Sequence, residues 1–187
     1  MKKLVPSSSP ASQAPATSVS VGQLALRFGV AGGILCAGWM LILLATGSNP
    51  FGPKQLLAQL LVPMLAVAAQ WRLRQRLAPA RAGVGRQLTL GGLVVLLAAG
   101  ITASSVVGLA DGAGKDKLLA MTRQETQEIL RADMQARSKS QRDPAQEQRQ
   151  LAALQQLSIG DIAVNIFTKT LLLGLALAVP GGIFFRE

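Results

Sequence analysis

The chain has 187 residues, of which 50% are hydrophobic and 15% are charged, and it carries a net charge of +10. Soluble domains carry about 25% charged residues, so this composition argues against a soluble fold. The single cysteine excludes an intrachain disulfide, and the chain contains no histidine, the commonest metal ligand.

Charge is absent or nearly absent from four blocks of the chain. A helix that crosses the hydrocarbon needs about 20 apolar residues; three of the blocks reach this length and the second is slightly short. The predicted spans are residues 24–46, 55–71, 88–110 and 162–185. The sequence therefore predicts an all-α membrane protein with four transmembrane helices, within a membrane domain of residues 22–187.

The first 21 residues are rich in Ser, Ala and Pro and show no periodicity, which predicts a disordered cytoplasmic tail. Lys2 and Lys3 resemble the start of a signal peptide. A Pro/Ser segment, residues 6–10, follows where an apolar core would be required, so we expect no signal peptide.

Small residues recur at every fourth position in three of the predicted spans. They are Gly29, Gly33 and Ala37 in the first span, Gly100, Ser104 and Gly108 in the third, and Gly174, Ala178 and Gly182 in the fourth. Such a stripe lets another helix approach closely. In the first span it could join two copies of the chain or two spans of one chain, and we favour the second interpretation. Together the stripes predict a compact bundle.

Residues 47–53 are dense in helix breakers and predict a short outer turn. Pro63, in the second span, lacks a backbone N–H and predicts a kink. A kink can serve as a gate, but proline is common and tolerated in spanning helices, and we favour the structural role.

An arginine cluster follows the second span and consists of Arg72, Arg74, Arg76, Arg81 and Arg86. An apolar run closed by arginines is typical of a segment that reaches the cytoplasmic side. The cluster would attract anionic lipid by about 1 kcal/mol per basic residue near the surface, although its simplest role is to set the topology. No aromatic platform or recognition motif accompanies it, so we expect no nucleic-acid partner.

The distribution of charge predicts that both termini are cytoplasmic. In that orientation nine basic residues and one acidic residue lie on the inner side. The outer side receives Lys54 and a segment, residues 111–161, with eight basic and eight acidic residues. This asymmetry follows the positive-inside rule.

The soluble insert of residues 111–159 predicts a helical extracytoplasmic hairpin between the third and fourth spans. In its first helix, Leu118/Leu119 and Ile129/Leu130 lie eleven residues apart and share a face. Its second helix is expected to begin with Asp143 as N-cap and to carry an apolar stripe at Leu151, Leu154 and Leu157. We expect these apolar faces to meet each other, the membrane surface or a partner.

Lys169 is the one charged residue inside the fourth predicted span, and Asn165 lies one turn earlier on the same face. Intramembrane ionisable residues are candidates for function, so the two residues form a candidate intramembrane polar cluster. Alternatively, the lysine stem extends to the outer interface and places its ammonium there. We favour this second interpretation.

Two stretches, NPFGPKQLLAQLLVPMLAVAAQWRLRQR and SIGDIAVNIFTKTLLLGLALAVPGGIFFRE, together with the Glu/Gln/Arg-rich helical loop between them, resemble a bacterial membrane family known as domain of unknown function 4199. The resemblance covers roughly residues 21–187. It implies a four-span protein of the bacterial inner membrane with a helical loop before the last span. It implies no activity and no catalytic residue.

The sequence contains no metal-ligand spacing, nucleophile–base pair or glycine-rich phosphate loop in a suitable context, so we expect neither an enzyme nor a cofactor. The best prediction is a non-catalytic accessory or scaffold subunit of the inner membrane that presents its outer hairpin to a protein partner or forms a homo-oligomer. The alternative is a small transporter or channel component that uses the polar face of the fourth span.

Overall fold

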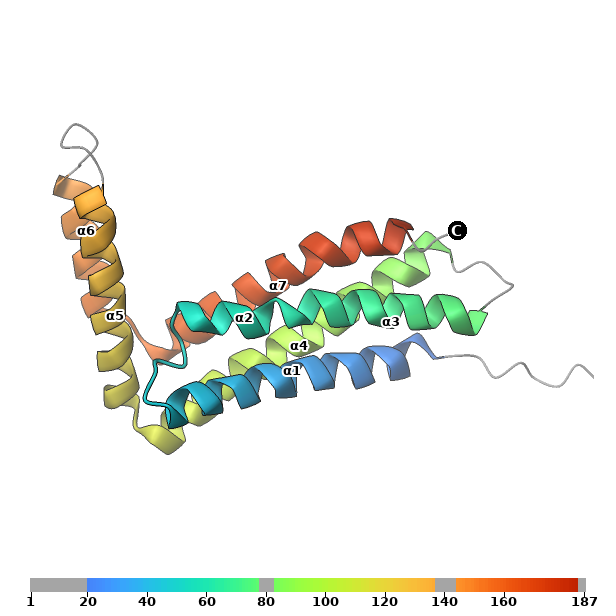
Figure 1. Cartoon of the computed structure of the whole chain (residues 1–187), viewed down its shortest axis with the longest axis horizontal. Coiled ribbons are helices and arrows are strands. Elements are labelled where there is room, and N and C mark those ends of the chain that lie inside the picture. The colour runs from blue at the N-terminus through green and yellow to red at the C-terminus, as the bar shows by residue number, and fades with distance from the viewer. Residues whose placement is uncertain (1–19, 78–82, 137–143, 185–187) are drawn as a thin grey trace, which may run out of the picture.

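The computed structural model describes residues 20–77, 83–136 and 144–184, and within these ranges every regular element is a helix (Figure 1). The elements are α1 (Val21–Ala45), the 3-10 turn η1 (Pro53–Gln55), α2 (Leu56–Gln59), α3 (Leu61–Leu77), α4 (Val84–Ala113), α5 (Lys115–Ala136), α6 (Pro144–Gln155) and α7 (Ile159–Phe184). The predicted disordered tail and Arg81 lie outside the described residues.

Four helical stretches of the described chain are long and apolar enough to cross a membrane, as in a multi-pass membrane protein. They are α1, the stretch Pro53–Leu77 that joins η1, α2 and α3, α4, and α7. The prediction of an all-helical protein with four spans is therefore confirmed. The second span, expected to be short, has 25 residues because its helix continues through the first arginines.

The bundle is organised around α4. This helix packs against α1 and α7, and α3 lies across all three (Figure 1). The face of α4 that enters the core carries Val94, Val95, Ala98 and Thr102, all fully buried. Positions spaced by three or four residues share one face of a helix, so this face is continuous along the bundle.

Glycines on α1 and α7 allow these helices to lie close to α4. A Cβ atom at Gly29 would lie 2.7 Å from the Cβ of Leu97, and one at Gly33 would lie 2.5 Å from the Cβ of Ile101. On α7, a Cβ at Gly174 would collide with Val95. The favoured interpretation of the α1 stripe, packing within one chain, is confirmed.

The stripe predicted on α4 does not take part in this packing. Gly100 and Gly108 have no heavy atom within 4 Å of a Cβ built on them, and Ser104 is exposed. The expectation that this stripe closes the bundle is wrong, because α4 carries small residues on two faces. Its packed face is the one that bears Val95 and Ala98.

The second span is interrupted where proline predicted a kink. α2 ends at Gln59 and α3 begins at Leu61, two residues before Pro63. Because proline lacks an N–H and its ring crowds the carbonyl four residues earlier, Gln59 is the residue whose backbone bonding it disturbs.

We call α5 and α6 together the arm. The two helices pack against each other and lie across one end of the bundle (Figure 1). The described part of α5 ends at Ala136, and the predicted N-cap Asp143 lies outside the described residues.

The arm is anchored by a small apolar cluster in which Leu118 is fully buried beside Met40 and Val106. At the other end of the same α5 face, Ile129 is 49% exposed. The α5 face predicted from the eleven-residue spacing is therefore buried against the bundle at Leu118 and half exposed at Ile129.

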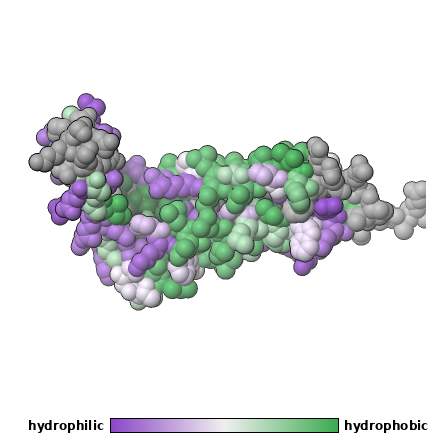
Figure 2. Space-filling model, turned by 45° about the horizontal axis from the view of Figure 1, so that its top comes forward, coloured by the Kyte–Doolittle hydropathy of each residue, from purple (hydrophilic) through white to green (hydrophobic). Residues whose placement is uncertain are grey.

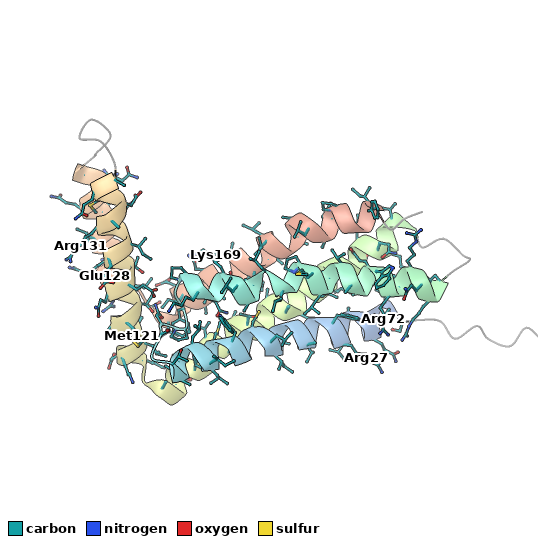
Figure 3. The ribbon with its side chains drawn as sticks, viewed as in Figure 1. Arg27, Arg72, Met121, Glu128, Arg131 and Lys169 are labelled. Atoms are coloured by element: carbon teal, nitrogen blue, oxygen red, sulfur yellow. The ribbon has the colours of Figure 1, made fainter. Side chains whose placement is uncertain are left out.

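The two ends of the bundle differ in character. A broad hydrophobic belt covers the spans between the hydrophilic arm and a polar patch at the opposite end (Figure 2). Arg27 and Arg72 lie at that opposite end, whereas Glu128 and Arg131 lie on the arm (Figure 3). The beginning of α1 and the end of α7 also lie at the arginine end (Figure 1).

Candidate functional site: the junction between arm and bundle

Asn49 joins the first turn to the arm. Its Oδ1 accepts a hydrogen bond from the N–H of Phe51 at 3.0 Å, which shapes the turn, and its Nδ2 donates to Glu125 Oε2 on α5 at 2.7 Å. The hydroxyl of Thr122, one turn before Glu125, lies 3.2 Å from the same Oδ1. The carboxylate of Glu125 rests against Gly52, where any Cβ would collide with it. The Asn-Pro-Phe-Gly turn is thus shaped to receive α5.

A second connection links α5 to the start of α7. Arg123 Nη2 donates to the carbonyl oxygen of Leu157 at 3.0 Å. The next residue, Ser158, forms a capping box with Asp161. The N–H of Ser158 donates to Asp161 Oδ2 at 3.0 Å, and the N–H of Asp161 donates to Ser158 Oγ at 3.2 Å. Arg123 therefore holds the arm at the point where α7 begins.

Between these two connections lies a cavity of about 420 Å³. Its walls come from the first turn and α2, from the inner face of α5, from the end of α6 and from the first three turns of α7. Leu56, Ile129 and Ile166 supply part of its apolar lining. Polar side chains also line it, among them Gln55, Gln59, Glu125, Asp161, Asn165 and Lys169.

Two of these polar side chains have unused hydrogen-bonding capacity. Gln55 and Gln59 are each only 2% exposed. Both amide atoms of Gln55 and the Oε1 of Gln59 lack a partner among the described residues. A buried amide without partners costs about 1–3 kcal/mol, and these amide atoms lie beneath the surface of the cavity.

The predicted polar cluster lies in the wall of this cavity. Asn165 and Lys169 are both exposed, and Lys169 belongs to the part of α7 near the arm (Figure 3). No hydrogen bond or ion pair joins the Lys169 ammonium to another described residue. Between them on the helix, Ile166 is buried in the bundle. Both interpretations of Lys169, an intramembrane polar cluster with Asn165 and an ammonium placed at the outer interface, stay predictions.

The predicted lipid-contact residues lie far from this junction. Arg72, Arg74 and Arg76 are exposed at the end of α3, and Arg86 lies in the first turn of α4. The structure does not bring them to the cavity, and contact with anionic lipid stays a prediction.

A second polar group lies inside the bundle near the arginine end. Gln70, fully buried on α3, donates through Nε2 to the carbonyl oxygens of Ala178 at 2.9 Å and Gln87 at 3.1 Å. Gly91, Gly181 and Gly182 surround its amide so closely that a Cβ on any of them would press against it. Gln70 thus connects three spans.

The sequence interpretation missed both glutamine groups. Gln55 and Gln59 stand one helical turn apart in an otherwise apolar segment, which is a signal that could have been used. The role of Asn49 had no such signal, because its partner Glu125 lies 76 residues away. Among the described residues, no group of three His, Cys, Asp or Glu side chains could hold a metal ion.

A family model described as protein of unknown function (DUF4199) matches residues 27–187. No curated protein and no solved structure matches the chain.

Proposed function

The chain belongs to the DUF4199 family of proteins of unknown function, and we propose from its junction that it is a non-catalytic accessory protein that presents its arm to a protein partner. In this proposal the protein resides in the bacterial inner membrane with both termini in the cytoplasm and the arm outside.

The fixed position of the arm carries this proposal. Asn49 and Arg123 tie α5 to the bundle at two separate points, and Leu118 anchors it in an apolar cluster. The face of α5 turned away from these contacts remains exposed and carries Gln124, Glu128 and Arg131. A surface that is ordered before binding loses less conformational entropy when a partner docks, so a fixed arm suits presentation better than a loose one.

The charge distribution supports the orientation. Arg27 and Arg72 lie at the end of the bundle opposite to the arm (Figure 3), and Arg74 and Arg76 lie in the last turn of α3. Basic residues favour the cytoplasmic side of spanning segments. The insert that contains the arm has balanced charge, which suits an extracytoplasmic location.

Site-specific photocrosslinking in intact cells would test the proposal. A photoreactive residue at position 128, on the exposed face of α5, should give one discrete protein adduct. The same residue at position 172, on the apolar surface of α7 where Leu172 is 63% exposed, is the matched control and should give none. The double variant Asn49→Ala/Arg123→Ala should weaken the adduct without loss of protein from the membrane.

An adduct from position 128 that is unchanged in the double variant would contradict presentation by a fixed arm. The lack of any adduct along the exposed face, at positions 124, 128 and 131 alike, would contradict a protein partner at this surface.

A transporter or channel component is the second candidate, and one observation favours it. Gln87 and the Oε1 of Gln70 have buried polar atoms without partners among the described residues, so polar groups occur near both ends of the bundle. The packing in the middle of the bundle argues against a transport pathway, because Gly33 fits closely against Ile101 and Gly174 fits closely against Val95. Purified protein in liposomes should leave proton and potassium permeability at the level of empty liposomes; a clear increase that Gln87→Leu abolishes would favour transport.

A further inference from the structure

We propose that the cavity at the junction binds the head group of a zwitterionic glycerophospholipid from the surrounding bilayer. The phosphate would lie at Lys169, and the ammonium group would lie at the outer rim beside Glu125 and Asp161. This site requires no protein partner and is independent of the function proposed for the arm.

The order of charges along α7 carries the inference. Asp161, Asn165 and Lys169 follow one another at intervals of four residues and line the same cavity. Four residues advance a helix by about 6 Å, so the acidic and basic residues stand about 12 Å apart along the axis, with the acidic one nearer the arm. In a zwitterionic phospholipid the ammonium group likewise lies outward of the phosphate, toward water.

The direction of the lysine side chain shortens this separation. Side chains in an α-helix lean toward the helix N-terminus. The N-terminus of α7 is at the arm, so the stem of Lys169 leads outward toward Asn165. The ammonium can therefore meet a phosphate at the level of the head groups while its stem stays against apolar lining.

The polar groups of the cavity also match the two ends of such a head group. Lys169 has no hydrogen-bond or ion-pair partner among the described residues, and the buried amide of Gln55 has none either. The Lys169 ammonium can donate to phosphate oxygens, whereas the amide atoms of Gln55 lie beneath the surface of the cavity. The carboxylates of Glu125 and Asp161 are held in place by Asn49 and Ser158 through one oxygen each, which leaves the other oxygen of each for an ammonium group.

Charge complementarity selects one class of occupant. An anionic lipid would place its charge beside two carboxylates, and a cationic amphiphile would meet Lys169. A head group with both charges satisfies all three residues at once. The volume of about 420 Å³ lies within the usual range of ligand pockets, about 300–1,000 Å³.

The acyl chains have a surface to follow. Leu56 lines the cavity and is 49% exposed, and its neighbour Leu57 is 61% exposed. α2 packs beside α7 at this point. A lipid whose head group enters the cavity can thus keep its chains along the hydrophobic belt, whereas a soluble zwitterion gains nothing from that surface.

Native mass spectrometry of the full-length protein, released from a neutral detergent, would test the site. Phosphatidylethanolamine, phosphatidylcholine and phosphatidylglycerol are offered in equal amounts, and free phosphoethanolamine is offered in a separate sample. We expect both zwitterionic lipids to be retained in preference to phosphatidylglycerol, and free phosphoethanolamine not to be retained.

Three variants separate the parts of the site. Lys169→Met should lower retention of the zwitterionic lipids by about fivefold, the value expected for one basic residue at a membrane surface, and Lys169→Arg should restore it. Glu125→Gln, which can still accept the hydrogen bond from Asn49, should bind lipid but shift the preference toward phosphatidylglycerol. Lys54→Met is the matched control, because Lys54 is a basic residue near the same end of the bundle but outside the cavity wall, and it should change nothing.

Circular dichroism, as a measure of helix content, and elution volume show whether each variant is folded. If Lys169→Met does not fold, Lys169→Arg still tests the site, because it keeps the positive charge. Preference of the wild type for phosphatidylglycerol would overturn the inference, as would equal losses in Lys169→Met and Lys54→Met. Retention of free phosphoethanolamine as strong as that of the lipids would also overturn it, since the ligand would then be a soluble zwitterion.

Discussion

Buried glutamines lie near both ends of this bundle, and the hydrogen bonding of Gln70 at one end differs from that of Gln55 at the other. Near the arginines, the Gln70 amide donates to the backbone of two other spans within a cradle of glycines. Near the arm, the amide of Gln55 is as deeply buried but has no partner among the described residues, and a cavity adjoins it. Gln70 thus joins three spans near one end of the bundle, whereas Gln55 near the other end adjoins a cavity.

The difference lies in the neighbours rather than in the glutamines. Glycines at 91, 181 and 182 leave just enough space for the Gln70 amide, so its hydrogen bonds are enforced by packing. At the arm end the walls come from a turn, from α5 and from α7, which are far apart in the sequence and meet only at a few points. We therefore expect changes near Gln70 to affect stability and changes near Gln55 to affect binding.

The largest expected effect concerns the side of the membrane on which each end lies. In a Cys36→Ser background, Glu128→Cys on the arm should react completely with an impermeant maleimide in intact spheroplasts. Arg76→Cys at the opposite end should react only after the membrane is opened. Reaction of position 76 but not 128 in intact spheroplasts would invert the proposed orientation.

Filling the glycine cradle should cost the most stability. Gly91→Leu would place atoms where the Gln70 amide lies, and overpacking of this kind typically costs about 1–3 kcal/mol. Gly100→Leu on the same helix is the matched control, because a Cβ there meets nothing within 4 Å. Unfolding by sodium dodecyl sulfate in mixed micelles measures both. Equal losses of stability would show that the cradle is not specific.

Replacing the glutamines themselves compares the two ends directly. Gln70→Leu removes two hydrogen bonds to carbonyl oxygens and should lower the free energy of unfolding by about 2 kcal/mol. Gln55→Leu removes an amide without partners in the described chain, so it should be neutral or slightly stabilising in the absence of ligand. Unfolding by sodium dodecyl sulfate in mixed micelles measures the stability of both variants. A loss of stability in Gln55→Leu as large as that in Gln70→Leu would refute the distinction between the two ends.

The sequence was sufficient for the spans because each is defined by its own composition. Twenty apolar residues without charge predict a spanning helix whatever surrounds them. The second and third predicted segments lie within long helical stretches, the first extends one residue beyond α1, and the fourth extends to residue 185, outside the described residues. The same composition argument placed Lys169 and Asn165 in the fourth span, and both lie in α7.

The sequence was insufficient wherever two segments must meet. Gly29 and Gly100 belong to identical patterns of small residues, yet Gly29 touches Leu97 and Gly100 touches nothing. The pattern reports that a helix can be approached and does not report from which side. The cavity depends on Asn49 and Glu125, 76 residues apart, and no local periodicity could have joined them.

The smallest expected effect concerns how firmly the arm is held. Asn49→Ala removes the hydrogen bond to Glu125 on the arm and, within the turn, the acceptor for the N–H of Phe51. The Thr122 hydroxyl keeps its hydrogen bond to the carbonyl oxygen of Leu118, so the arm loses one hydrogen bond, which typically costs about 1 kcal/mol. Because Leu118 and Arg123 still hold α5, the arm should stay attached but open more often. Local opening of this size raises hydrogen exchange in one segment while the rest is unchanged, and it should raise exchange about fivefold over α5. Ser48→Ala is the matched control, since the Ser48 hydroxyl accepts a hydrogen bond from Lys54 in the same turn and has no hydrogen bond to the described residues of the arm. Faster exchange in α4 as well as α5 would mean that Asn49 stabilises the whole bundle, and no change in either would mean that the arm does not depend on it.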